Sequence, residues 1–487
     1  MCGKRKNSGK NRPAAVRGLK DAAGGDNLAI TSLAVPGHGL RDCETSIQKG
    51  EGMIRFRELG LICALLAALS AVSAPIEADK CLMVGDSERN PLGYRVGDEL
   101  KFTVDLKYTG APYDTGDYEV IWKRSGDDGI VRIGKLKMEQ LPYTWTDKFT
   151  RPGFIRYRAE LHKKGGKMLR AGKRGIVFDG SAGADVRTLE PSPEPADFDA
   201  FWAEQRARLA KVPLKFTMNE VRTLNGGKAK AYAVQVACAG ARPVTGYLYM
   251  PVDKSRKYPA RVRFFGWSKD PAAAQKIFRG ADLSEIQFSI NAHGYELNQT
   301  IEYYKKFFAS VSSNGHDYAF DPVQNSDRLT AYFNGMALRV MRALEFVKTL
   351  PEWNGRDLIV SGGSQAGLQS LWAAGLDKDV TAVEVFKPWC CDLAGHAKAL
   401  RMRSIFAPSY TPALDYYDGA FHAKRIKCPV NIKIAGLGDF VCPPSGMMSM
   451  FNNLQVPAKI RFYQGEGHGG SLSTPGNPPH YDLSNGK

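Results

Sequence analysis

Apolar and polar residues alternate with a period of two in several short segments between residues 81 and 177. This is the period of β-strands with one buried face, and turns rich in Gly, Asp and Pro separate the segments. About seven short strands within ~100 residues, with no long helical pattern between them, predict a small immunoglobulin-like β-sandwich over residues 75–185. The clearest strands are expected at residues 99–106, 118–123, 130–137 and 154–162.

The pattern changes after a proline-rich segment at residues 186–200. Residues 188–197 contain three prolines, which is typical of a linker between domains, and Asp197 is placed to cap a helix that begins at Phe198. From residue 201 to residue 487, apolar β-type runs alternate with helical stretches. The later runs are almost continuously apolar, as expected where helices cover both faces of a sheet, so the pattern predicts an α/β domain with a mostly parallel sheet. Strands are expected at residues 232–239, 245–250, 260–265, 287–292, 357–361, 381–386, 430–435 and 459–463, and helices at 328–349, 365–375 and 445–454.

The N-terminal segment predicts export. Arg55 and Arg57 precede an apolar run at residues 59–69 and small residues at 70–74, which is the layout of a secretory signal peptide over residues 53–74. The run is too short to span a bilayer, so we expect a secreted or periplasmic protein without stable membrane insertion. Residues 1–52 lack apolar periodicity and are rich in Gly, Lys and Arg, which predicts a disordered leader. Because export signals normally start at the N-terminus, Met53 as the true first residue is the favoured alternative.

Charge and cysteine content exclude two classes of function. The formal net charge is +17, but the basic residues are spread along the chain and no run interleaves them with aromatic residues. A nucleic-acid partner is therefore not expected. Six of the nine cysteines follow the leader and none belongs to a Cys-x-x-Cys pair, so no metal site is predicted. Export permits disulfides, although buried free thiols are the favoured state.

Ser364 lies where an expected strand turns sharply into a helix. Residues 358–376 read LIVSGGSQAGLQSLWAAGL, an apolar strand followed by two glycines, the serine and a helix. This is the setting of the nucleophile elbow of α/β-hydrolases, in which the neighbours Gly362 and Ala366 must be small because the turn is tight. Ser364 is the candidate nucleophile, and a helix N-cap serine is the alternative. The amide of Gln365, at the helix N-terminus, can donate to an oxyanion.

In an α/β-hydrolase the catalytic acid and then the base follow the nucleophile along the chain. His468 lies in the Gly-rich segment QGEGHGG after the strand expected at 459–463, and Asp439 is the only carboxylate in the loop after the strand at 430–435. These two are the candidate base and acid of a Ser-His-Asp triad. The loop after the strand at 260–265 makes the amide of Trp267 the candidate second oxyanion donor. The other histidines that follow Ser364 are expected at the surface: His396, His422 and His480.

Five sequence blocks resemble the acetyl xylan esterase / cephalosporin C deacetylase family of carbohydrate esterases, over about residues 191–470. The blocks are DFDAFW at 197–202, GYLYMP at 246–251, GGSQAG at 362–367, DFVCPPS at 439–445 and GHGG at 467–470. The resemblance implies an α/β-hydrolase fold and removal of acetyl groups from the hydroxyls of acetylated oligosaccharides or polysaccharides. Ser364 would attack the acetyl carbonyl and His468 would carry the proton. It also implies a possible homo-oligomer.

Two departures from the family pattern leave the ester open. Residues 265–269 read FGWSK where the family has His-Gly-Tyr-Gly-Gly, and residues 292–294 read AHG where it has Arg-Gly. A feruloyl-type esterase or peptidase on the same fold, and a non-catalytic carbohydrate-binding protein, remain as alternatives. The N-terminal β region is an addition that can bind carbohydrate or pack on the catalytic domain, and the second role is favoured. No cofactor is expected, because no phosphate-binding glycine loop or metal-ligand spacing is present.

Overall fold

The computed structural model of the chain describes residues 75–274, 281–471 and 478–487. The predicted leader at 1–52 and the predicted signal peptide at 53–74 lie outside the described residues. No helix in the described part of the chain is long and apolar enough to cross a membrane.

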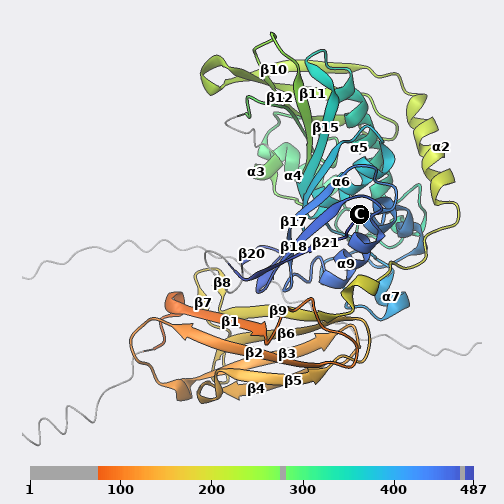
Figure 1. The fold of residues 1–487 in the computed structure, drawn as a ribbon. Helices are drawn as coiled ribbons and strands as arrows, with labels where there is room; N and C mark the ends of the chain where they lie inside the picture. The colour runs from red at the N-terminus through yellow and green to blue at the C-terminus, as the bar shows by residue number, and fades with distance from the viewer. Residues whose placement is uncertain (1–74, 275–280, 472–477) are drawn as a thin grey trace, which may run out of the picture. The chain divides into compact units, whose positions relative to one another are not determined.

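Residues 81–184 form two antiparallel sheets that pack face to face (Figure 1). One sheet has the order β1-β2-β5, with β1 at Cys81–Ser87, β2 at Glu99–Tyr108 and β5 at Tyr143–Lys148. The other has the order β4-β3-β6-β9, with β4 at Arg132–Lys137, β3 at Tyr118–Gly126, β6 at Gly153–Lys163 and β9 at Val177–Ala184. Tyr157 joins the two sheets, because its ring lies 4.8 Å from that of Phe102 and 4.9 Å from that of Trp145. A short ladder pairs β7 (Arg170–Ala171) with β8 (Arg174–Gly175). The four strands expected from the alternation are confirmed.

Helix α2 (Phe198–Ala210) begins where the sequence predicts, but Asp197 does not cap it. The Asp197 side chain makes no hydrogen bond to the first turn. Its carboxylate instead accepts hydrogen bonds from the Arg328 guanidinium and the Tyr416 hydroxyl. Both carboxylate oxygens are thus engaged outside the helix, Oδ2 by Arg328 and Oδ1 by Tyr416, so the predicted capping role is wrong.

The second part of the chain is built on a ten-stranded mixed sheet, in the order β10-β11-β12-β14-β13-β15-β16-β17-β18-β21. The pairs from β14 to β18 are parallel, and antiparallel pairs flank them on both sides. All eight predicted strands are confirmed, whereas the two edge strands were not predicted. The strands are β10 Phe216–Leu224, β11 Ala229–Val236, β12 Val244–Pro251, β13 Tyr258–Phe264, β14 Ile286–Ile290, β15 Trp353–Gly363, β16 Ala382–Phe386, β17 Val430–Gly436, β18 Ala458–Tyr463 and β21 His480–Ser484.

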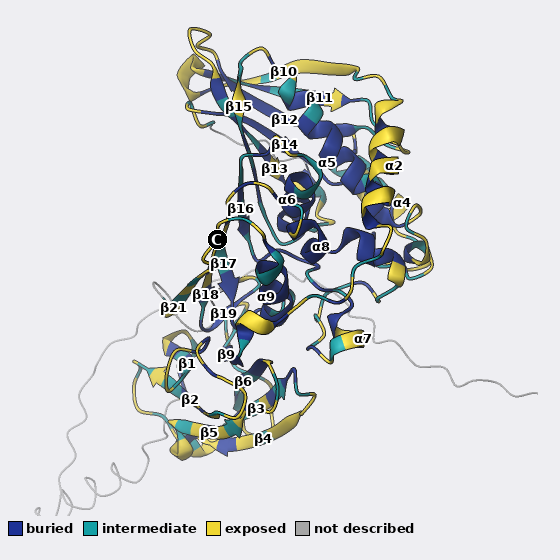
Figure 2. Cartoon of the chain, turned by 45° about the vertical axis from the view of Figure 1, so that its right-hand side comes forward, coloured by how far each residue is buried: buried dark blue, intermediate teal, exposed yellow. Residues whose placement is uncertain are grey.

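Helices α5 (Tyr332–Lys348), α6 (Gln365–Leu376), α8 (Gly419–Ala423) and α9 (Pro444–Asn453) pack one against the next along one side of the sheet (Figure 2). Helix α6 lies against β15 and β16, and residues 365–374 are buried because α5 and α8 also cover the helix. Helix α4 (Ile301–Ser310) was not predicted from the sequence.

The other side of the sheet is polar along its central strands. Arg261 of β13 pairs with Glu285 and with Glu384 of β16, and Lys433 of β17 pairs with the same Glu384. Side chains at alternate positions of β16 and β18 are at least partly exposed there. In the described residues, the expectation that helices cover both faces is therefore wrong for these strands, because polar residues alternate with apolar ones in them.

Candidate active site

Ser364 occupies a sharp turn between β15 and α6. Its backbone has φ 56° and ψ −125°, a region that non-glycine residues rarely adopt and that is found where function requires strain. A Cβ atom added to Gly362 would lie 2.4 Å from the Cβ of Ala366. The glycine is therefore required for the turn to close against Ala366, which explains why a methyl group is tolerated on the far side of the serine.

His468 connects Ser364 to Asp439 through hydrogen bonds. Its Nδ1 lies 2.9 Å from Oδ2 of Asp439, and its Nε2 lies 3.0 Å from the Ser364 hydroxyl. Oδ1 of Asp439 accepts hydrogen bonds from the backbone amides of Val441 and Cys442, at 3.0 and 2.9 Å. The Asp439 side chain is fully buried and that of His468 is 29% exposed. The predicted triad residues thus meet at the carboxyl ends of β15, β17 and β18.

This arrangement has the geometry of general-base activation. With a proton on Nδ1 donated to Asp439, the Nε2 atom of His468 can accept the Ser364 proton as the hydroxyl attacks an electrophile. The two hydrogen bonds from backbone amides to Asp439 hold its carboxylate in the orientation that selects this tautomer.

The structure ties together the start of α6, which carries the Gln365 amide, and the loop after β13, which carries the Trp267 amide. Neither the Gln365 nor the Trp267 N–H donates to another described residue, so both are free to bind an oxyanion. Tyr318 donates its hydroxyl proton to the Gln365 side chain and accepts the Ser268 amide, both at 3.2 Å. Gln369 of α6 donates to the Phe265 carbonyl at 3.1 Å. Burial raises the pKa of Tyr318, which keeps the hydroxyl protonated as a donor.

Lys387 is a supporting residue that sequence reasoning missed. It directly follows β16, has φ 44°, and is buried. Its ammonium group contacts the Glu466 carboxylate at 2.6 Å and the carbonyls of Gly467 and His468. These bonds hold the loop that carries His468. A single lysine after a strand carries no signal in the sequence, since its partners lie about 80 residues further along the chain.

The remaining histidines after Ser364 do not all lie at the surface. His422 is fully buried and its ring bonds to the Tyr416 carbonyl. Burial lowers the pKa of His422 to about 3, so the ring is neutral. His480 is exposed, as expected, and lies in edge strand β21. The expected surface position is therefore wrong for His422.

All six cysteines of the described residues are free thiols. One of them, Cys442, has its Sγ within 4.8 Å of ligand atoms of Asp439 and His468. This group does not suit a metal ion, because Asp439 and His468 already bond to each other and burial raises the pKa of the Cys442 thiol. A protonated thiol is a poor metal ligand.

A mixed sheet with parallel central strands, a strained serine between strand and helix, and an aspartate and a histidine after later strands define the class of α/β-hydrolases. The chain belongs to the acetyl xylan esterase family (AXE1), whose family model matches residues 186–406 and 408–474. It is therefore a carboxylic ester hydrolase.

The chain is also similar to an acetyl esterase and to two acetyl xylan esterases of known structure. The acetyl esterase Axe7A of Xylanibacter ruminicola is 28% identical over 416 residues, which cover 80% of this chain and 88% of that protein. Two solved structures align with 58% of this chain at 23% identity. They are an acetyl xylan esterase from Paenibacillus sp. R4, 93% covered with a TM-score of 0.47, and acetyl xylan esterase 1 from Thermoanaerobacterium sp. JW/SL YS485, 92% covered with a TM-score of 0.45.

Proposed function

We propose that the chain removes acetyl groups from the sugar hydroxyls of acetylated xylan or xylo-oligosaccharides, through a Ser-His-Asp triad of Ser364, His468 and Asp439. The observation that carries this proposal is the position of His468, whose two ring nitrogens lie 2.9 and 3.0 Å from Asp439 and Ser364. Membership of the acetyl xylan esterase family supports the acetyl group and the sugar alcohol as the two halves of the ester.

In the first half-reaction the Ser364 oxygen attacks the acetyl carbonyl carbon while His468 Nε2 takes the hydroxyl proton. The amides of Gln365 and Trp267 receive the negative charge that develops on the carbonyl oxygen. The tetrahedral intermediate then breaks its bond to the sugar oxygen, and His468 gives its proton to the departing alcohol. In the second half-reaction His468 deprotonates a water molecule, which attacks the acetyl-serine and releases acetate and Ser364.

The aromatic packing around Trp267 supports a small acyl group. The indole ring stacks on Tyr318 at 5.4 Å and meets Phe406 edge-on at 4.9 Å. These rings pack around the residue that supplies the proposed second oxyanion amide. We therefore expect an acetyl group to be accepted more readily than an aromatic feruloyl group.

We further propose that residues 53–74 direct export and that residues 75–185 are an immunoglobulin-like sandwich. The orders β1-β2-β5 and β4-β3-β6-β9 support the second proposal, because they place seven strands in two facing antiparallel sheets. Residues 186–200 then form the linker to a catalytic domain at 201–487. A homo-oligomer remains a prediction.

The test is hydrolysis of p-nitrophenyl acetate and of acetylated xylo-oligosaccharides by the wild type and by Ser364→Ala. We expect Ser364→Ala to lose at least about 10³-fold in kcat/KM on both substrates, and the exposed-site control Ser326→Ala to match the wild type. Activity that survives Ser364→Ala would reject the triad. A p-nitrophenyl ester series should favour acetate over butyrate and over aromatic acids, and a preference for aromatic acids would reject the acetyl assignment.

A further inference from the structure

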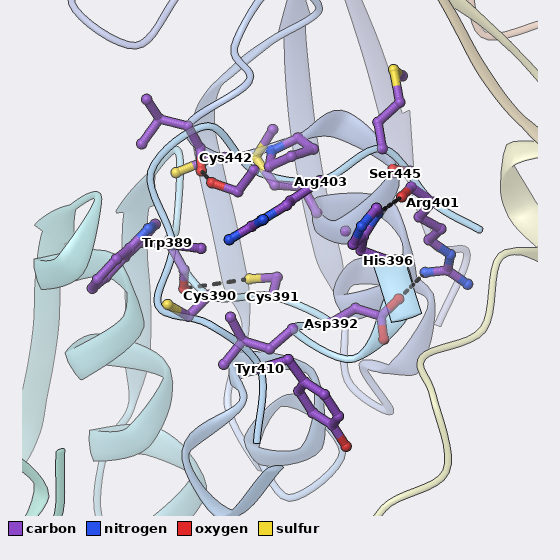
Figure 3. Close-up of a pocket in the computed structure, with 18 of the residues that line it drawn as sticks. Trp389, Cys390, Cys391, Asp392, His396, Arg401, Arg403, Tyr410, Cys442 and Ser445 are labelled. Atoms are coloured by element: carbon purple, nitrogen blue, oxygen red, sulfur yellow. Dashed lines mark hydrogen bonds and ion pairs between the residues drawn. The ribbon is translucent and has the colours of Figure 1, made fainter. Parts of the chain in front are cut away.

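A cavity of about 210 Å³ lies beside the candidate active site and is not used by the triad (Figure 3). It shares two walls with the site. Trp389, which lines the cavity, donates its amide to the Ser364 carbonyl at 3.1 Å. Cys442, on another wall, has its Sγ within 4.8 Å of His468 and Asp439. The cavity and the triad thus share two neighbouring residues, and we expect a group bound in the cavity to belong to a ligand that also reaches Ser364.

Arg403 enters this cavity from a loop that is held on both sides. The Met402 amide donates to Asp127 at 2.8 Å, and the Ile405 amide donates to the Phe440 carbonyl at 2.7 Å. The Ser404 hydroxyl donates to the Val441 carbonyl at 2.6 Å. The backbone of Arg403 is thus fixed relative to the loop that carries Asp439, while its side chain extends across the pocket in Figure 3.

The charged groups that line the cavity leave Arg403 without a counter-charge. Asp392 pairs with Arg401, whose other nitrogen donates to the Glu190 carbonyl. His396 bonds through Nδ1 to the Arg401 carbonyl at 3.0 Å. Arg403 makes no ion pair or hydrogen bond with any described residue. Arg403 is exposed to solvent and lines the cavity, so one positive charge stays unpaired at the cavity wall.

A guanidinium presents paired N–H donors in a planar fork, which matches a carboxylate. The cavity is smaller than the ~300–1,000 Å³ typical of pockets for drug-sized ligands, so it admits one sugar unit rather than a chain. We propose that Arg403 binds the carboxylate of a uronic acid unit on the acetylated oligosaccharide and so makes the enzyme selective for acidic substrates. This inference rests on the proposed esterase function and deepens it.

The test compares two acetylated xylo-oligosaccharides of equal length, one carrying a uronic acid branch and one without it. Wild type, Arg403→Gln, Arg403→Lys and the control Arg356→Gln are measured as full chains. Arg356 pairs with Asp357 at the far end of β15. We expect wild type and Arg356→Gln to prefer the acidic substrate. The ratio of kcat/KM for acidic over neutral substrate should fall about tenfold in Arg403→Gln, and Arg403→Lys should keep an intermediate ratio.

Two outcomes would overturn the inference while leaving the esterase intact. The first is equal hydrolysis of both substrates by the wild type. The second concerns the acetate product, which is also a carboxylate. If Arg403→Gln weakens inhibition by free acetate but leaves the substrate ratio unchanged, the cavity binds product rather than a uronate. Failure of the wild type to hydrolyse p-nitrophenyl acetate would instead reject the proposed function itself. If Arg403→Gln has the same thermal unfolding midpoint as the wild type, a changed ratio does not come from misfolding.

Discussion

The Ser181 hydroxyl donates a hydrogen bond of 2.7 Å to the carbonyl of Leu437, 256 residues later in the chain. Ser181 lies in β9 of the N-terminal β region, and Leu437 lies two residues before Asp439. Between them, a Cβ atom on Gly438 would come within 2.0 Å of the Asp179 carbonyl oxygen. Strand β9 therefore packs directly on the loop that carries the candidate acid.

Gln464 connects the same strand to the loop of His468. Its side-chain oxygen accepts the Ser181 amide at 3.2 Å, and its NH₂ group donates to the Ser181 carbonyl at 3.1 Å and to Asp86 at 2.9 Å. The loops of the proposed acid and base are thus held by one residue of the N-terminal region. These contacts support the prediction that this region packs structurally on the catalytic domain.

We predict that Gln464→Leu lowers kcat about 10- to 100-fold with a smaller change in KM, because it shifts His468 without removing it. It should also cost about 1–3 kcal/mol in the free energy of unfolding, since the Ser181 amide and carbonyl lose their partners. Steady-state kinetics and urea unfolding measure the two effects. The exposed control Gln455→Leu should change neither, and a Gln464→Leu enzyme with wild-type kcat would show that β9 does not position His468.

Tyr318→Phe tests the coupling of the two oxyanion loops. The variant removes only the hydroxyl that joins the Ser268 amide to the Gln365 side chain. We expect kcat to fall about tenfold on p-nitrophenyl acetate while KM changes little, because the loss is of transition-state stabilisation. Tyr303→Phe, which removes a hydroxyl that accepts the Glu296 amide, is the matched control. A larger effect on KM than on kcat would contradict this role.

Lys387→Met tests the buried ion pair beneath the His468 loop. Both side chains are 10% exposed, so Glu466 would be left as an unpaired buried charge. We expect a loss of about 3–5 kcal/mol in unfolding free energy. Adding Glu466→Leu should restore much of that loss, because the uncompensated charge is removed. If the losses in unfolding free energy of the two single variants add up to that of the double variant, the pair is not coupled.

Stability should fall in acid partly because of His422. Its folded-state pKa of about 3 lies below the ordinary value of 6.5, so the unfolded chain binds a proton that the folded chain does not. The contribution of His422 is therefore complete above pH ~6.5 and is lost as the pH falls towards about 3, with a slope of up to about 1.4 kcal/mol per pH unit. His422→Gln should flatten the dependence of unfolding free energy on pH in this range. The exposed control His480→Gln should leave the slope unchanged, and an unchanged slope in His422→Gln would contradict the assignment.

Short sequence patterns predicted Ser364, Asp439 and His468, because each follows directly after a recognisable strand. The strand, two glycines and helix around Ser364 define a turn within a few residues, and Asp439 and His468 follow strands whose apolar runs are visible. The support by Lys387 and Gln464 was not predictable, because their partners are remote and polar contacts leave no periodicity. Strand β10 was missed since nearly all its side chains are exposed. The second face of the sheet was misjudged because the polar residues Glu384 and Lys433 alternate within runs that look apolar as a whole.

The contacts of β9 also set an order of assembly. Domains generally fold as units during synthesis, N-terminal part first, so β9 can form long before Leu437 and Gln464 leave the ribosome. The two loops that carry the proposed acid and base then pack on a strand that has already formed. Because Leu437 and Gln464 both follow Ser364 in the chain, a partly synthesised chain can contain Ser364 yet lack the group that would activate it. The full hydrogen-bonded site can form only after the chain has been synthesised as far as His468.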